Sequence, residues 1–177
     1  ITLESYSQKA AERNIALIKR INQHVPEIAL KYSEVLQLTP SGNATERHII
    51  SAYIQKASDV FHEKNALIAY WSELLKLGLE QTAELIATGN KLEDVVRSKF
   101  AKRGGFGYVQ PSSETFPPVE DFFAFVKSCG AIPMESWLDG TSEGEKDGLA
   151  LLELSKSKGA AALNLIPDRN WNIADSK

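Results

Sequence analysis

Two segments near the end of the chain repeat one order of features at an offset of 34 residues. In each segment a helical stretch ends at a glycine, a short apolar run follows, and a polar cluster comes next. Ile132-Pro133 in the first segment corresponds to Ile166-Pro167 in the second, and Trp137 corresponds to Trp171. The offset matches the roughly 30-residue βαβ unit, and continuous apolar runs are typical of strands in a parallel sheet. The repeat therefore predicts two parallel strands joined by a helix.

The chain changes character near Arg103. Before it, apolar residues recur at helical spacing, and Asn43 with Glu46 has the pattern of an N-cap and its N3 partner, which predicts a helix beginning at Asn43. We therefore predict a helical block over 1–103 and an α/β region over 104–177, packed as one unit. The predicted helices lie at 3–23, 26–38, from 43, from 59, 82–88, 91–102, 119–128 and 142–158, and the predicted strands at 131–134 and 160–166.

Charge and cysteine content exclude some classes of function. The net charge is −3 with no basic stripe, which disfavours nucleic acid as a main partner. No apolar run approaches the roughly 20 residues that span a bilayer, so no membrane partner is expected. Cys129 is the single cysteine, which excludes an internal disulfide and favours a cytoplasmic location. The chain starts without Met, and we expect it to be an internal piece of a larger protein.

Polar side chains follow both predicted strands. Asp139 comes after the first, and Asp168, Arg169 and Asn170 come after the second. Ligands of α/β folds bind at the carboxyl ends of parallel strands. Two carboxylates and a guanidinium there suit metal binding, acid–base chemistry or phosphate recognition. The alternative is that these are solvated loop residues, and that Trp137 is a packing residue rather than a pocket wall.

A second candidate site lies in the helical block. Arg47 and His48 fall in the first turns of the helix predicted from Asn43, where the helix dipole favours an anion. Together they could hold a phosphate; the alternative is a solvent-facing pair. His24 and His62 have no metal-ligand spacing around them, and we interpret both as structural or exposed.

Three stretches carry a family resemblance. Residues 43–50 read Asn-Ala-Thr-Glu-Arg-His-Ile-Ile, residues 116–134 predict a helix, a glycine and a strand, and residues 158–164 enter the next strand. In this order they resemble the central part of the PHP superfamily, the polymerase and histidinol phosphatase type of metal-dependent phosphoesterase. The resemblance covers about the last three quarters of the chain. In place of the family's Ala-His-Pro motif this chain has Ala131-Ile132-Pro133, and isoleucine binds no metal.

The resemblance implies a fold and a chemistry. The fold would be α/β: the helical block followed by parallel βα units of a partial, distorted TIM-like (β/α)7 barrel. The activity would be hydrolysis of phosphate esters with Mn, Zn or Mg. Arg47, His48, Arg169 and Asn170 would bind the phosphate of a small-molecule substrate, and Asp139 and Asp168 would be catalytic.

Two hypotheses of function follow. The first is a fragment of such a hydrolase, inactive alone because barrel sites draw residues from several strands. The second is a non-catalytic module that binds a small molecule or a protein, which Ile132 favours. In either case a partial barrel exposes sheet edges and apolar faces, so self-association is expected.

Overall fold

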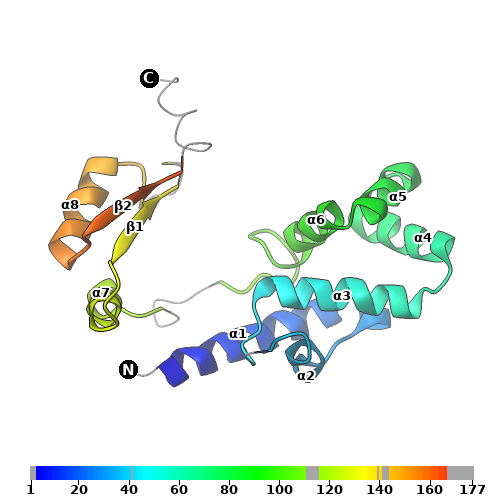
Figure 1. Cartoon of the computed structure of the whole chain (residues 1–177). Helices are drawn as coiled ribbons and strands as arrows, with labels where there is room; N and C mark the ends of the chain where they lie inside the picture. Colours follow the sequence, from blue (N-terminus) through cyan, green and yellow to red (C-terminus); the bar gives the residue numbers. More distant parts are fainter. Residues whose placement is uncertain (1–2, 41, 111–115, 139, 141–143, 167–177) are drawn as a thin grey trace, which may run out of the picture. The chain divides into compact units, whose positions relative to one another are not determined.

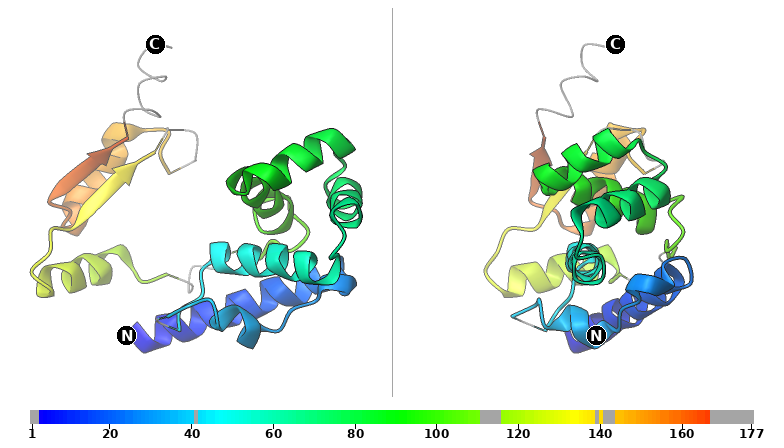
Figure 2. Two further views of the ribbon diagram at one scale, coloured as in Figure 1. Left: turned by 45° about the vertical axis from the view of Figure 1, so that its right-hand side comes forward. Right: turned by 90° about the vertical axis from the view of Figure 1, so that its right-hand side faces the viewer.

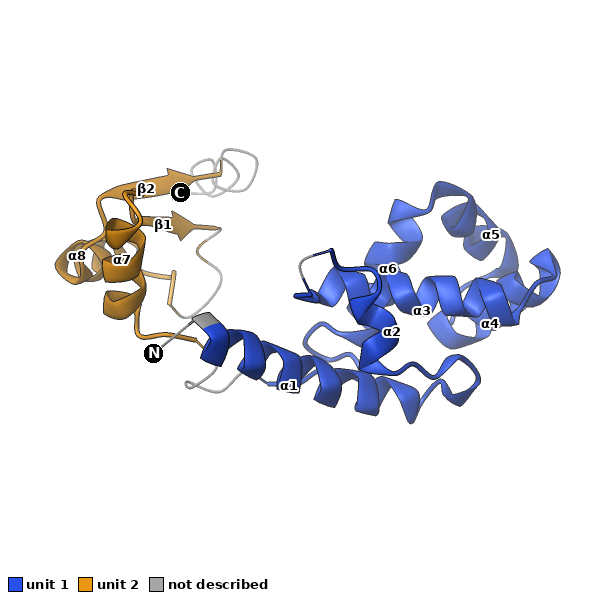
Figure 3. Ribbon diagram, turned by 60° about the horizontal axis from the view of Figure 1, so that its bottom comes forward, with its two compact units in different colours: residues 1–115 blue, residues 116–177 orange. Residues whose placement is uncertain are grey.

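The structure, a computed structural model, divides into two compact units, residues 1–115 and residues 116–177 (Figure 3). It describes residues 3–40, 42–110, 116–138, 140 and 144–166. Each unit is considered by itself. No helix within these described ranges is both long and apolar enough to cross a membrane.

The regular elements among the described residues of unit 1 are all helices (Figure 1). The helix predicted over 26–38 is wrong, because this stretch forms two short pieces with an extended link between them. The side chain of Asn22 holds that link: its Oδ1 accepts the N–H of Leu30 at 3.0 Å, and its Nδ2 donates to the Leu30 carbonyl at 2.8 Å. The elements of the unit are α1 (Leu3–Asn22), η1 (Pro26–Ile28), α2 (Tyr32–Leu36), α3 (Glu46–Val60), α4 (Lys64–Leu75), α5 (Leu79–Thr88) and α6 (Asn90–Phe100).

Aromatic side chains from α3, α4 and α6 form the centre of the unit 1 core. Trp71, Tyr53 and Phe100 are fully buried. Phe100 lies 5.5 Å from Tyr53 and 6.2 Å from Trp71 between ring centroids. The Tyr53 hydroxyl donates to Asn22 Oδ1 at 2.6 Å, and burial raises the pKa of Tyr53 above its ordinary value. The Tyr53 hydroxyl thus joins α1 to α3 through satisfied polar contacts inside the core.

The described residues of unit 2 form one βαβ unit preceded by a helix. Its elements are α7 (Val119–Ser128), β1 (Met134–Trp137), α8 (Gly148–Lys158) and β2 (Ala162–Leu165). The strands are parallel, with Met134 opposite Ala162 and Trp137 opposite Leu165, as the sequence repeat predicts. Helix α8 lies against one face of the pair (Figures 1 and 2). Lys158 on α8 forms an ion pair with Glu120 on α7.

The predicted TIM-like (β/α)7 barrel is wrong. The described residues contain a single two-stranded sheet, and their other regular elements are helices, so they supply no further barrel strands. The 34-residue repeat identifies a βαβ unit, which open sheets and barrels share, and such a unit carries no information about how many strands complete the sheet. The first strand is also displaced: it begins at Met134, where the predicted strand ended, because Pro133 has no backbone N–H to give a sheet.

Candidate functional site

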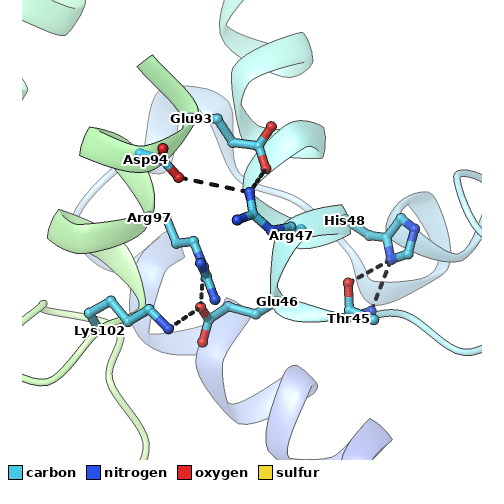
Figure 4. Close-up of polar contacts among 8 residues, drawn as sticks. All are labelled: Thr45, Glu46, Arg47, His48, Glu93, Asp94, Arg97 and Lys102. Carbon is cyan, nitrogen blue, oxygen red and sulfur yellow. Dashed lines mark hydrogen bonds and ion pairs between the residues drawn. The ribbon is translucent and has the colours of Figure 1, made fainter. Parts of the chain in front are cut away.

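His48 takes part in capping helix α3. This helix begins at Glu46 with Thr45 as its N-cap, two residues after the predicted cap at Asn43. His48 Nδ1 accepts the backbone N–H of Thr45 at 3.0 Å and lies 2.9 Å from Thr45 Oγ1 (Figure 4). Asn43 Oδ1 instead accepts a hydrogen bond from Ser7 Oγ on α1 at 2.7 Å. The histidine therefore fills the N3 position that the sequence analysis gave to Glu46.

Arg47 is directed toward helix α6. Its Nη1 lies 3.2 Å from Glu93 Oε1 and 3.8 Å from Asp94 Oδ1, and the side chain is 59% exposed. Figure 4 shows Arg47 and His48 pointing to different partners. The two predicted phosphate ligands are therefore not brought together, and an anion would compete with two carboxylates for Arg47.

Glu46 completes an ion-pair network between the start of α3 and the end of α6. Its Oε1 accepts from Arg97 Nε at 2.5 Å and lies 3.2 Å from Lys102 Nζ (Figure 4). Burial alone would raise the pKa of Glu46, but the hydrogen bonds from Arg97 and Lys102 outweigh it and hold the pKa below its ordinary value. With the Arg47 pairs, the cluster matches three cations with three carboxylates. This charge balance suits a structural clamp between two helices better than an anion site.

Glu46→Gln is expected to lower the free energy of unfolding by about 1–2 kcal/mol at pH 7, because it removes the charged acceptor of Arg97 and Lys102 and keeps the side-chain shape. A carboxyl whose pKa is lowered in the folded state stabilises the fold above its ordinary pKa, 4.5, and this contribution disappears as the pH falls through the folded-state value. The difference between wild type and variant should therefore be full at pH 7 and shrink below pH 4.5. Urea denaturation at several pH values measures it, and a pH-independent difference would contradict the assignment.

Glu135 and Ser136, two polar residues of β1, lie on opposite faces of the sheet. Glu135 lines a hollow of about 250 Å³ beneath α8, together with Leu152, Ser155 and Lys156. Ser136 Oγ, on the other face, accepts from Asn164 Nδ2 at 3.3 Å. This alternation is the ordinary consequence of strand geometry. The two side chains therefore do not form one site.

The remaining predicted site residues lie outside the described residues. These are Asp139, Asp168, Arg169 and Asn170, together with Trp171. Trp137 donates its indole N–H to the Glu145 carbonyl at 3.2 Å and packs beside Gly140.

Metal-binding chemistry has no cluster to support it in the part of the chain that the structure describes, since no group of three or more His, Cys, Asp or Glu side chains gathers there. His24 stacks on Phe106 with ring centroids 4.5 Å apart. Ile132, at the position of the family's metal-binding histidine, is 69% exposed. Metal-dependent hydrolysis stays a prediction, because its two carboxylates are not among the residues described.

Comparison with protein-family models, with curated proteins and with solved structures finds no match. The resemblance to the PHP superfamily therefore stays a prediction as well. Sequence reasoning missed the clamp of Glu46, Arg97 and Lys102. Its only local signals were an acidic residue in the first turn of α3 and basic residues around the end of α6, which many helices have for the sake of the dipole.

Proposed function

We propose that this chain is a protein-interaction module, in which unit 1 is a folded helical scaffold and unit 2 makes the contact. The observation that carries the proposal is the distribution of exposed apolar side chains. Among the described residues, sixteen large apolar side chains are exposed, and twelve of them lie in unit 2, although unit 1 is the longer. The twelve are Phe116, Val119, Phe122, Phe125, Ile132, Met134, Leu138, Leu149, Leu152, Leu154, Leu163 and Leu165.

The amount of exposed apolar surface favours a protein partner. With about half of each side chain exposed, the twelve present on the order of 1,000 Å² of apolar surface in total, distributed over α7, α8, both strands and the segments between them. A standard protein interface buries about 800 Å² on each partner. A contact of that size would cover a large part of the apolar surface that unit 2 exposes.

Helix α8 gives the same indication. Its leucines do not keep to the face that packs on the sheet: Leu149 is 75% exposed, Leu154 is 54% exposed and Leu152 is 41% exposed. A helix that is apolar on several sides is normally covered on several sides. The sheet covers one face of α8, and a partner protein would cover another.

Photo-crosslinking tests this proposal. A benzophenone side chain is introduced into the full chain in place of Leu149 or Leu154, or in place of Leu79 on α5, which is 60% exposed and serves as the matched control in unit 1. Leu149 and Leu154 are expected to yield one and the same adduct, with the partner identified by mass spectrometry, and Leu79 is expected to yield none. Equal labelling from all three positions, or no adduct from α8, would show that unit 2 is not an interaction surface.

A further inference from the structure

Strand β2 has a free edge. It pairs with β1 on one side, and no strand in the described ranges pairs with its other side. Unit 1 contributes only helices among its described residues, so it supplies no strand to extend the sheet. The outer edge of β2 therefore presents backbone N–H and C=O groups that a further strand could bind.

The two edges of the sheet differ in their protection. Proteins block exposed edges with charged side chains and prolines, and β1 carries a charge, since Glu135 lies within the strand. Strand β2 reads Ala-Leu-Asn-Leu, with no charge and no proline. Leu163 and Leu165 are 40% and 56% exposed. The β2 edge is thus apolar, uncharged and open to pairing.

The sequence of β2 is complementary to itself. If two copies pair antiparallel about a two-fold axis at Asn164, Leu163 of each copy lies opposite Leu165 of the other on the face that carries α8. On the other face the two Asn164 amides lie opposite each other, where they can hydrogen-bond. Apolar and amide cross-strand pairs of this kind stabilise a sheet. Asn164 therefore meets an amide, and Leu163 and Leu165 each meet a leucine of the other copy.

The position of α8 fits the same arrangement. A crossover helix lies over the two strands that it joins, and neighbouring strands are about 4.8 Å apart. Continuing the sheet through a β2–β2 pair would place the two α8 helices on one face, with axes about 10 Å apart, which is the ordinary packing distance of helices. The exposed leucines of α8 would then supply the helix–helix contact beside the strand pair.

From these observations we propose that the partner of unit 2 is a second copy of this chain, joined through an antiparallel β2–β2 pair into a four-stranded sheet with α8 beside its counterpart. This inference rests on the proposed function and names its partner. A closed two-fold pair also covers the unprotected edge of β2, which leaves only the protected β1 edges outermost.

Leu165→Lys tests the pairing in the full chain. At 56% exposed, the side chain tolerates a charge without loss of folding, and Leu79→Lys in unit 1, at 60% exposed, is the matched control. Sedimentation equilibrium should give wild type and Leu79→Lys twice the 19.5 kDa chain mass. Leu165→Lys should weaken dimerisation about tenfold or more, with an unchanged circular dichroism spectrum. A wild type that is monomeric at all concentrations, or a Leu165→Lys dimer as tight as wild type, would overturn the proposal.

A disulfide tests the register independently. In a Cys129→Ser background, Asn164→Cys would face its own counterpart across the two-fold axis, at a Cα separation of about 4.5–5.5 Å that permits a disulfide. Mild oxidation should convert this variant to a covalent dimer. Leu163→Cys should give much less covalent dimer, because in this register Leu163 lies opposite Leu165 and not opposite its own counterpart. Equal yields would contradict this register.

The photo-crosslinking experiment separates this inference from the proposed function. A monomeric wild type that still crosslinks through Leu149 to a different protein would refute self-pairing and leave the interaction module standing. A monomeric wild type that gives no crosslink from Leu149 or Leu154 would refute both proposals.

Discussion

Trp71→Ala is expected to lower the free energy of unfolding by about 3–5 kcal/mol, as large-to-small changes of buried aromatic residues do. Trp71 on α4 is fully buried, and its ring lies 6.2 Å from Phe100 and 5.3 Å from Tyr70 between centroids. Its removal would leave a cavity between α4 and α6 that the surrounding helices cannot fully close. Guanidinium denaturation of the full chain, followed by circular dichroism, measures the loss.

Trp71→Phe separates the volume of the ring from its polar atom. The indole Nε1 of Trp71 is buried and has no hydrogen-bond acceptor among the described residues. Phenylalanine keeps most of the apolar ring and removes this unsatisfied donor, whose burial costs about 1–3 kcal/mol. We therefore expect Trp71→Phe to cost less than about 1.5 kcal/mol. If the two variants are equally unstable, cavity formation is not the cause.

The second large effect is expected from Gly107→Ala, at about 2–3 kcal/mol of lost stability, because the site is already filled. A Cβ at this position would lie 2.5 Å from Ile21 Cγ1 and 2.7 Å from the Phe100 carbonyl oxygen. The backbone of the loop is fixed there, since Gly107 N–H donates to that same carbonyl at 2.9 Å. A side chain could rotate away from the new methyl group, whereas the carbonyl of Phe100 could not.

Gly78→Ala is the matched control for this clash. Gly78 has φ −67°, and a Cβ there would meet nothing within 4 Å. Gly78 is the N-cap of α5, where the absence of a side chain contributes little to stability. Gly78→Ala should therefore lower the free energy of unfolding by less than about 1 kcal/mol. Thermal unfolding of the two variants compares them directly. A similar melting temperature for both would show that the loop at Gly107 moves aside.

The helices and the strand pair were the most predictable parts of the fold. Helix α7 spans Val119–Ser128, as predicted, and α1 ends at Asn22, one residue before the predicted end. Gly159, with φ 105°, ends α8 as predicted, because glycine adopts the left-handed conformation without steric cost. These signals are local: apolar spacing and a terminal glycine act within a few residues of the chain.

The start of α3 shows where local signals mislead. Asn43 and Glu46 have the residue types of a capping box, as do many pairs at this spacing. Asn43 instead bonds to Ser7, and Glu46 bonds to Arg97, which is 51 residues away. Long-range partners of this kind withdraw side chains from local roles. The helix consequently begins at Glu46, and His48 contributes to its cap.

The sequence by itself determined that most of residues 3–100 form helices and that β1 pairs in parallel with β2, because periodicity and the order helix, glycine, strand are properties of neighbouring residues. Only the tertiary structure decided which charges meet, where Arg47 points, and how much apolar surface unit 2 exposes. It also limited the described sheet to two strands where a barrel was predicted. The physical reason is that ion pairs, sheet size and exposure depend on contacts between residues far apart in the chain, which spacing alone does not encode.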